Sequence, residues 1–263
     1  MRFQLQLDSK NRNPIIPINY QYPLSAAIYK ILDQADADYA AFLHEEGYTV
    51  DGGLKHFKLF TFSDLKGRCK GNHDRLHINS IMELIVSFHL PEAAQHFVKG
   101  LFLSQDIDIA DSKSKATFKV NSVEALPDPF VDFEKDVNST MTFRPLSACV
   151  AGIKNDKDDY DFIPPTDARF AFCIKHNWEE KLKALKIPFD ENELKVDVNR
   201  KNTKPKSRLI TVKAFTKQQT RIKGYLNFEM ELTGNSEQLQ VIYNAGAGLY
   251  NALGMGCLGV LEE

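Results

Sequence analysis

Five glycines stand close together in the segment NAGAGLYNALGMGCLGVLEE (residues 244–263) near the end of the chain. They are Gly246, Gly248, Gly254, Gly256 and Gly259. A glycine inside an element costs roughly 0.5–1 kcal/mol relative to alanine, so the cluster indicates a loop that bends tightly or lies very close to another group. Backbone N–H groups of such loops can bind phosphate.

A nucleotide-dependent enzyme is disfavoured, because no Lys-Ser or Lys-Thr pair follows the glycines. A nucleotide-binding titration would decide that alternative.

A basic segment, RKNTKPKSRLITVKAFTKQQTRIK (residues 200–223), precedes the glycines. It contains nine Lys or Arg residues and no Asp or Glu, although the formal net charge of the whole chain is −2. Acidic residues gather elsewhere, at 127–136 and 155–161. A long basic run that alternates with apolar residues predicts a surface that binds an anionic ligand. The alternative is a hairpin whose charges are merely solvated.

Several classes of protein are excluded by composition. The four cysteines are far apart and form no C-x-x-C pair, which argues against a disulfide framework or a zinc site. We therefore expect no metal and no cofactor. No apolar run approaches the roughly 20 residues that span a bilayer, and the first ten residues contain no apolar signal-peptide core. We expect a cytoplasmic protein that does not bind membranes.

The elements that must position these residues follow from hydrophobic periodicity. In the first half, strands are expected at 2–7, 57–63, 80–90 and within 107–126, and helices at 24–32, 37–47 and 91–102. In the second half, strands are expected at 140–152, 193–215, 222–234 and 256–263, and helices at 167–185 and 236–246. Each half then has the order β-α-β-β-α-β, which is typical of a ferredoxin-like fold.

We therefore predict an α+β protein made of two tandem ferredoxin-like domains with antiparallel sheets. The domains occupy residues 1–125 and 140–263, and a Pro-containing acidic linker joins them at 126–139. The Gly-rich loop lies between the last helix and the last strand of the second domain. A single mixed α+β domain is the structural alternative.

Several motifs together resemble one known family. The glycines follow the spacing G-h-G, five residues, G-h-G, where h is apolar, directly before the final strand. The stretches MRFQLQL, IPINYQYPLSAAIYKIL, FLHEEGY, KLFTFSDL and TFRPLSACV occur in the family's order. Nearly the whole chain thus resembles the CRISPR-associated endoribonucleases of the RAMP superfamily, which cut precursor CRISPR RNA within its repeats. The resemblance implies two RRM-like domains, a basic cleft that binds CRISPR repeat RNA, and cleavage without metal. It also allows a place in an effector ribonucleoprotein complex and leaves a homodimer open.

The family's usual active site combines a tyrosine, a histidine and a lysine. By local motif, the resemblance places them on Tyr29 in AIYK, His44 in FLHEEGY and Lys58 in FKLFTFS, while Lys55 and His56 could take the part of Lys58. RNA is cut when its 2′-hydroxyl attacks the adjacent phosphorus, and this step needs a base, an acid and a cation. Imidazole titrates near pH 6.5 and can serve as either acid or base. An ammonium group can stabilise the developing charge.

Each of these residues also has a purely structural interpretation. Tyr29 lies at the edge of an apolar helical stripe and could be a packing residue. His44, in a last helical turn, could interact with the helix C-terminus, and Lys58 could be a solvent-facing strand residue. His73 and His77 form a second pair, but the Asn, Gly and Asp around them predict a turn or strand, so we expect no catalytic role there.

The resemblance and the charge pattern together predict the RNA-binding residues, which are Arg200, Lys201, Lys204, Lys206, Arg208, Gly246, Gly248, Gly254 and Gly256. Leu249 and Tyr250 stand in the middle of the glycine loop, where relatives often carry charged residues. Any phosphate contact from this loop is therefore expected from its backbone. The remaining alternative is a non-catalytic RNA-binding RAMP subunit, which a cleavage assay would separate from an enzyme.

Overall fold

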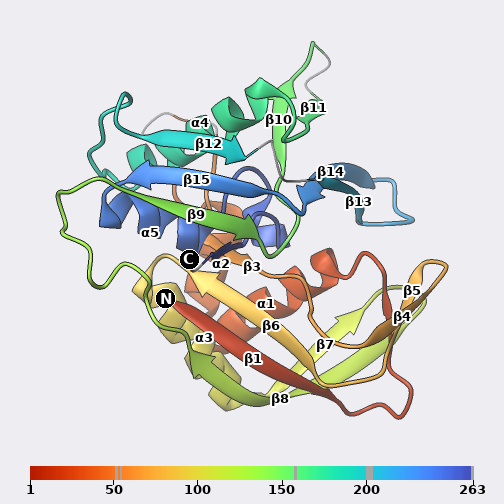
Figure 1. Cartoon of the computed structure of the whole chain (residues 1–263). Helices are drawn as coiled ribbons and strands as arrows, with labels where there is room; N and C mark the ends of the chain where they lie inside the picture. The colour runs from red at the N-terminus through yellow and green to blue at the C-terminus, as the bar shows by residue number, and fades with distance from the viewer. Residues whose placement is uncertain (51–52, 54, 157–158, 200–203, 262–263) are drawn as a thin grey trace.

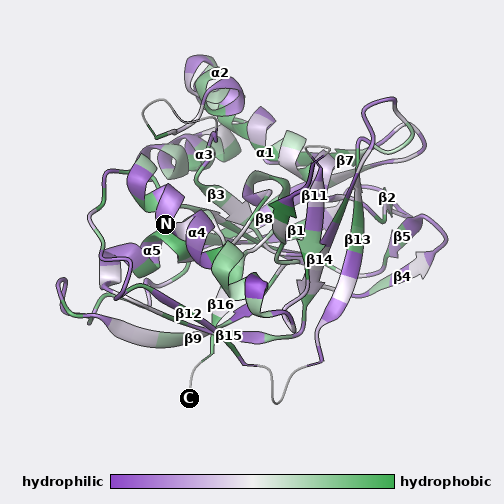
Figure 2. Cartoon of the chain, turned by 90° about the horizontal axis from the view of Figure 1, so that it is seen from above, coloured by the Kyte–Doolittle hydropathy of each residue, from purple (hydrophilic) through white to green (hydrophobic). Residues whose placement is uncertain are grey.

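A computed structural model of the chain describes residues 1–50, 53, 55–156, 159–199 and 204–261. Two antiparallel sheets lie one above the other, each with helices on one face, and both termini lie near the junction between them (Figure 1). Hydrophobic and hydrophilic residues are mixed along the helices and strands, as expected for elements that bury one face only (Figure 2). Within the described residues, no helix has the length and apolar character needed to cross a membrane.

The N-terminal half is built on a five-stranded sheet. Its strands are β1 (Arg2–Ser9), β3 (Phe60–Phe62), β6 (Met82–Phe88), β7 (Asp106–Ala110) and β8 (Lys115–Ala125), in the order β3-β6-β1-β8-β7. The helices are α1 (Gln21–Ala35), α2 (Ala37–Glu45) and α3 (Pro91–Leu103). A smaller sheet contains β2 (Ile15–Pro17), β4 (Cys69–Asn72) and β5 (Arg75–Ile78). The helix predicted to begin at Pro91 is confirmed. Proline suits this first helical position, because the backbone N–H that it lacks would have no partner within the helix.

Periodicity correctly identified the buried face of α1. Leu24, Ile28, Ile31 and Leu32 are all buried in the N-terminal core, and Tyr29 is half-buried at its edge. The helix ends at Ala35 because Asp36 is extended, and the Asp36 side chain then accepts a hydrogen bond from the backbone N–H of Tyr39 to cap α2. The two helices are therefore packed against each other with a sharp break between them.

The C-terminal half has its own four-stranded sheet. Its strands are β9 (Ser139–Pro145), β12 (Lys195–Asn199), β15 (Glu229–Gly234) and β16 (Leu258–Val260), in the order β12-β15-β9-β16. The helices are α4 (Ala168–Ala184), α5 (Ser236–Ala245) and the short 3₁₀ helix η1 (Asn251–Leu253). Two hairpins are inserted, β10 (Ala151–Lys154) with β11 (Tyr160–Ile163), and β13 (Lys206–Val212) with β14 (Thr220–Leu226).

Four predicted strands are shorter or interrupted in the structure. The stretch 140–152 divides into β9 and β10, the stretch 193–215 into β12 and β13, and the stretch 222–234 into β14 and β15. Asn227 has a left-handed backbone with φ +61°, which ends one strand and lets the next join a different sheet. The stretch 57–63 shortens to β3, because Leu59 has φ +52°. Lys58 therefore lies in the loop before β3 and not within a strand.

The segment 126–138 between the two halves contains no named helix or strand. Its Phe130 is nevertheless buried in the C-terminal core, with its ring 5.4 Å from that of Tyr243. Arg2 of β1 also crosses the junction: its buried guanidinium lies 3.5 Å from the centroid of the Tyr243 ring and donates to the carbonyls of Tyr243 and Leu258. These contacts fix the two sheets relative to each other.

Candidate active site

Three side chains predicted for catalysis come together in the N-terminal half. Tyr29 projects from α1, His44 from the last turn of α2, and Lys58 from the loop before β3. The rings of Tyr29 and His44 are 5.1 Å apart at an angle of 82°, and the Lys58 Nζ donates to the His44 carbonyl oxygen at 2.8 Å. His44 is exposed, while Tyr29 and Lys58 are half-buried. An imidazole open to solvent thus stands beside a phenol and an ammonium group.

Gly47 explains how Lys58 reaches this position. It ends α2 with φ +64°, and the next residue, Tyr48, forms an isolated β-bridge with Phe57. A Cβ atom at position 47 would lie 2.7 Å from the Phe57 carbonyl oxygen and 3.0 Å from the Lys58 side chain. Only glycine therefore lets the two segments approach closely enough to bring the lysine against the end of α2.

Burial shifts the pKa values of two of the three groups, Tyr29 and Lys58. It raises the pKa of the Tyr29 phenol above its ordinary value, so the group remains protonated at neutral pH and can donate a hydrogen bond. Burial lowers the pKa of Lys58, and the nearby carboxylate of Glu46 opposes that change. The site thus combines a neutral phenol with a lysine whose ammonium form is less stable than usual.

Lys55 and His56, the alternatives to Lys58, contact other groups of the protein. The Lys55 Nζ lies 3.3 Å from Nε2 of His176 on α4, and Nδ1 of His56 lies 2.6 Å from the Glu46 carbonyl oxygen. The geometry favours Lys58 over Lys55 as the lysine of this site. His73 and His77 belong to the β4–β5 hairpin, as the predicted turn or strand requires. Among the described residues, no group of three or more His, Cys, Asp or Glu side chains is arranged to hold a metal ion.

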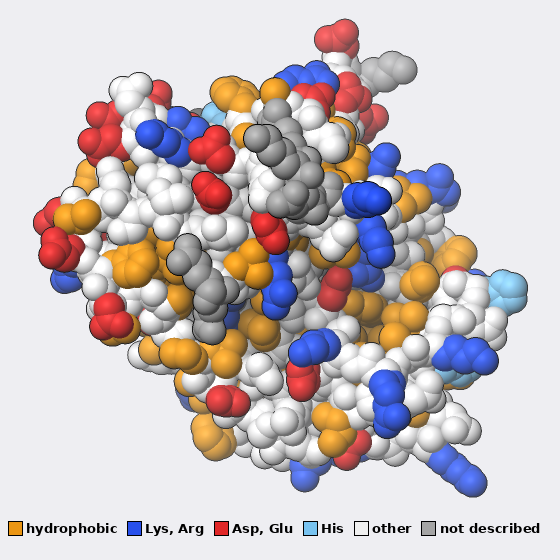
Figure 3. All heavy atoms as spheres, in the orientation of Figure 1, with side chains coloured by type: hydrophobic (Ala, Val, Ile, Leu, Met, Phe, Trp, Pro, Cys, Tyr) orange, Lys and Arg blue, Asp and Glu red, His pale blue; other side chains and the backbone are white. Residues whose placement is uncertain are grey.

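The predicted basic residues differ in how they are placed. Arg200 and Lys201 lie outside the described residues, while Lys204 and Lys206 are exposed at the start of β13. On the face shown in Figure 3, Lys and Arg side chains gather on the right-hand side, around β13–β14 and the β4–β5 hairpin. Basic side chains therefore border one side of the junction between the two halves.

Arg208 departs from the expected exposed position. It is half-buried, its Nη1 donates to Oδ1 of Asp64 at 2.7 Å, and its guanidinium lies 5.6 Å from the centroid of the Tyr20 ring. Both partners belong to the N-terminal half. Arg208 therefore ties the β13–β14 hairpin to that half, and its charge is already paired within the protein.

The glycine loop also differs from the expectation that it lies open to a ligand. Gly246, Gly248, Gly254 and Gly256 are all buried, with φ between +69° and +87°. A Cβ atom on Gly254 would lie 2.2 Å from the ring of Phe62 in β3, and one on Gly248 would lie 2.2 Å from a backbone oxygen of the C-terminal half. The close approach that the glycine pattern predicted is confirmed, but it is made to the protein itself.

Two hydrogen bonds join this loop to the elements that position the candidate catalytic residues. The Ser25 Oγ on α1 donates to the Ala252 carbonyl at 2.7 Å, and the Thr61 Oγ1 on β3 donates to the Met255 carbonyl at 2.9 Å. Helix α1 carries Tyr29, and β3 directly follows the loop that carries Lys58. The glycine loop of the C-terminal half therefore supports the site in the N-terminal half.

A buried lysine that the sequence reasoning missed holds the loop. The Lys181 Nζ donates to the Gly246 carbonyl at 2.6 Å and to Oδ1 of Asn251 at 2.7 Å. Burial lowers the pKa of Lys181 to about 7. The sequence contains a signal for this buried lysine. Lys181 falls on the apolar face of α4, at helical spacing from the buried Ile174 and Trp178.

Comparisons with known proteins agree on one family. The family model "CRISPR-associated protein Cas6, N-terminal" matches residues 15–123, and "CRISPR associated protein Cas6, C-terminal" matches residues 132–260. Together the two models span most of the chain.

Individual relatives match over at least nine-tenths of their length. The chain is 26% identical over 272 residues to the CRISPR-associated endoribonuclease Cas6 of Pyrococcus furiosus, covering 99% of this chain and 90% of the relative. It is 26% identical to the CRISPR-associated endoribonuclease Cas6 1 of Methanocaldococcus jannaschii, covering 100% and 94%. The solved structure of a Cas6-related protein from Pyrococcus furiosus superposes with a TM-score of 0.76 at 21% identity, covering 100% of this chain and 99% of that one. A structure described as "An RAMP protein binding different RNA substrates" superposes with a TM-score of 0.74 at 20% identity, covering 100% of both chains.

Proposed function

The chain belongs to the Cas6 family of CRISPR-associated proteins, and from this membership we propose that it is an endoribonuclease that cuts precursor CRISPR RNA within its repeats. The observation that carries the proposal is that Tyr29 and Lys58, both half-buried, lie beside the exposed His44. Repeat RNA is the proposed substrate, since the two relatives are named as CRISPR-associated endoribonucleases.

The proposed reaction needs only the groups of the RNA and of this site. The 2′-hydroxyl loses its proton and attacks the adjacent phosphorus, and the bond from phosphorus to the 5′-oxygen breaks as that oxygen gains a proton. The products are a 2′,3′-cyclic phosphate and a 5′-hydroxyl. The exposed His44 imidazole accepts the proton of the 2′-hydroxyl and donates a proton to the leaving 5′-oxygen, so the proton count is unchanged over the reaction. The Lys58 ammonium balances charge on the phosphorane oxygens, and the Tyr29 phenol donates a hydrogen bond that orients the reacting group.

We further infer that each half is a ferredoxin-like, RRM-like domain. In the N-terminal half, β1, β3, β6 and β8 follow one another in sequence with α1 and α3 in the crossovers, and they stand in the sheet order β3-β6-β1-β8. In the C-terminal half, β9, β12, β15 and β16 repeat that order with α4 and α5. The same arrangement in both halves supports domains at 1–125 and 140–263, joined at 126–139. Membership of an effector ribonucleoprotein, a homodimer and a cytoplasmic location remain predictions. Co-purification, size-exclusion chromatography and cell fractionation would test them in turn.

The test is incubation with the cognate repeat RNA in excess EDTA, followed by mapping of the RNA ends. We expect cleavage to persist and to leave a 2′,3′-cyclic phosphate, or its opened form, and a 5′-hydroxyl. A substrate with a 2′-deoxy nucleotide just upstream of the scissile phosphate should bind but remain uncut. A strict requirement for Mg²⁺ would overturn the proposed reaction. Tight binding without any cleavage would instead favour the non-catalytic RAMP subunit.

A further inference from the structure

A cleft lies between the tip of the β13–β14 hairpin and the N-terminal half. It has a volume of about 870 Å³ and is lined by Asn19, Tyr22, Phe215, Lys217, Gln219 and Arg221, among others. The hairpin is anchored near its middle, because the cross-strand pair Ile210 and Ile222 is buried in one cluster with Met255 of the glycine loop. The cleft is therefore a built feature that both halves of the protein form together.

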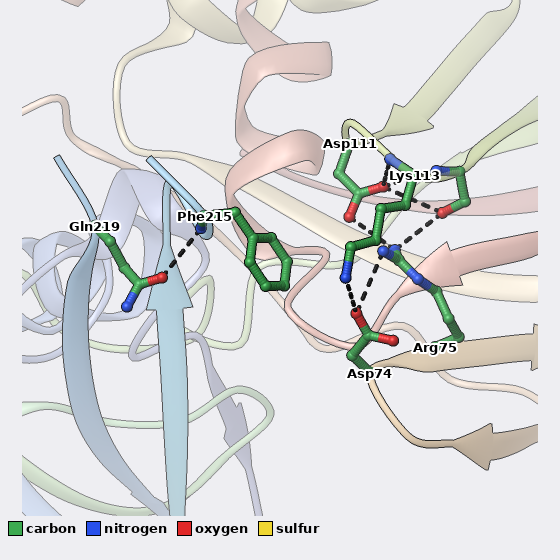
Figure 4. Close-up of polar contacts among 7 residues, drawn as sticks. Asp74, Arg75, Asp111, Lys113, Phe215 and Gln219 are labelled. Atoms are coloured by element: carbon green, nitrogen blue, oxygen red, sulfur yellow. Dashed lines mark hydrogen bonds and ion pairs between the residues drawn. The ribbon is translucent and has the colours of Figure 1, made fainter. Parts of the chain in front are cut away.

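Phe215 is held in this cleft in an unusual way. Its side chain is 65% exposed and its backbone has φ +64°, a conformation that is costly for a bulky residue. The backbone N–H of Phe215 donates to Oε1 of Gln219 at 3.0 Å, which stabilises the turn. Figure 4 shows its ring projecting from the hairpin toward the N-terminal half, where Nζ of Lys113 lies 4.0 Å from the ring centroid. A large apolar ring is thus kept in solvent by a strained turn, with one face covered by a cation.

The charges around the ring leave the cleft basic. The acidic side chains opposite Phe215 are neutralised: Asp74 lies 3.1 Å from Lys113, and Asp111 lies 2.7 Å from Arg75. Three cations line the hairpin side of the cleft: Lys213, Lys217 and Arg221. Among the described residues, no carboxylate lies within ion-pair distance of Lys217 or Arg221. Their charges are available to an anionic ligand.

Two amide groups add directional hydrogen-bond donors. Oδ1 of Asn19 accepts from the backbone N–H of Thr211 at 3.1 Å, and Oε1 of Gln219 accepts from Phe215. Because both oxygens are occupied by backbone donors, the orientation of each amide is set and its NH₂ group remains for a ligand. An exposed ring, unpaired cations and amide donors in one cleft are the groups that bind a single-stranded nucleotide.

A smaller groove adjoins this cleft. It has a volume of about 260 Å³, shares Tyr22 and Pro23 with the cleft, and runs between α1 and β7. Strand β7 lies at the opposite edge of the sheet from β3, against which Tyr29 packs. The cleft is therefore separate from the candidate active site.

We propose that this cleft binds one unpaired nucleotide of the substrate RNA, with its base stacked on the Phe215 ring and its phosphates contacting Lys217 and Arg221. The proposal rests on the proposed function, since it assumes that RNA is the substrate. It assigns Phe215 to substrate binding and not to the chemical step.

The experiment scans the repeat RNA with single 2-aminopurine substitutions, whose fluorescence changes when the base leaves its RNA neighbours and stacks on a protein ring. Wild type should change the emission at one unpaired position, and Phe215→Ala should abolish that change. Phe215→Ala should weaken binding by roughly 5- to 150-fold, the scale measured for loss of one stacked base. Phe215→Trp should retain both binding and the signal. Phe102→Ala is the matched control, because Phe102 is even more exposed, at 83%, but lies on α3 outside the cleft.

The outcomes separate this proposal from the proposed function. If wild type cuts and binds RNA but Phe215→Ala binds as tightly and no position reports stacking, the subsite is wrong and the function stands. Equal losses for Phe102→Ala and Phe215→Ala would also overturn the subsite, because the effect would then not be specific to the cleft. If wild type neither binds nor cuts repeat RNA, the proposed function fails and the subsite fails with it.

Discussion

Replacing Gly254 with alanine tests whether the glycine loop serves the fold or the ligand. Gly254 has φ +75°, and an alanine in this left-handed conformation costs about 1–2 kcal/mol. Its Cβ would also lie 2.2 Å from the buried ring of Phe62. Forcing a methyl group into a packed site typically costs about 1–3 kcal/mol. We expect the free energy of unfolding to fall by about 2–5 kcal/mol in total, a large part of the stability of an ordinary protein.

The assay is urea unfolding followed by the fluorescence of Trp178. Trp178 is the only tryptophan of the chain and is completely buried, so its emission reports loss of the C-terminal core. Gly71→Ala is the matched control. Gly71 lies on the exposed strand β4, and the nearest atom to an added Cβ is 4.0 Å away. This variant should stay within about 0.5 kcal/mol of wild type.

The opposite pattern would refute the structural role of the loop. If the glycines exist to let RNA approach, Gly254→Ala would unfold at the wild-type urea concentration and lose affinity for RNA. If Gly254→Ala and Gly71→Ala shift the unfolding midpoint equally, the close approach of Gly254 to Phe62 does not contribute to the free energy of unfolding.

Three further predictions concern the site, the basic surface and the buried lysine. His44→Ala should lower the single-turnover cleavage rate by about 10²–10⁴-fold with little change in RNA affinity, as measured by quench and filter binding, because His44 is exposed and supplies one acid–base group. Replacing Lys204 and Lys206 together with alanine should reduce the salt dependence of binding, by about 0.7 in the logarithmic slope for each phosphate that these lysines neutralise, and an unchanged slope would remove them from the interface. Burial lowers the pKa of Lys181 from 10.5 to about 7, so between these values the unfolded chain binds more protons than the native protein. The free energy of unfolding should therefore rise with pH by up to about 1.4 kcal/mol per unit, and urea titrations across this range should show that Lys181→Met lacks this contribution.

Local patterns were enough to predict most of the elements. The alternation in β1 and the apolar stripe of α1 depend on residues that are neighbours in sequence, so periodicity reveals them. The breaks within the long predicted strands were missed for a different reason. The residues around Asn227 remain suited to strands on both sides, and the break exists because β14 pairs with β13 while β15 pairs with β12. Strand partners are a tertiary property that a single sequence does not contain.

In the candidate site, too, the sequence predicted some residues, while others depend on tertiary contacts. The resemblance predicted Tyr29, His44 and Lys58, and the sequence left Lys55 and His56 as residues that could take the part of Lys58. The structure favours Lys58, because Gly47 and the bridge between Tyr48 and Phe57 place this lysine against the end of α2. The glycine spacing correctly predicted a close approach, yet it carried no information about which group approaches. For Gly254 that group is Phe62 of β3, a strand almost two hundred positions earlier in the sequence, whereas Gly248 approaches the backbone of the C-terminal half.

The contacts of the glycine loop explain why residues at both ends of the chain act as one unit. Helix α1 carries Tyr29 and strand β3 follows Lys58, and both elements donate hydrogen bonds to the loop that Lys181 clamps. A shift of the loop would therefore move the supports of two candidate catalytic residues without touching either side chain. The N-terminal half supplies the reactive groups in this arrangement, but their spacing depends on a lysine and a set of glycines in the C-terminal half. Separating the halves at the 126–138 segment would expose Phe62 and release both hydrogen bonds, so the geometry of the site requires the two halves in contact.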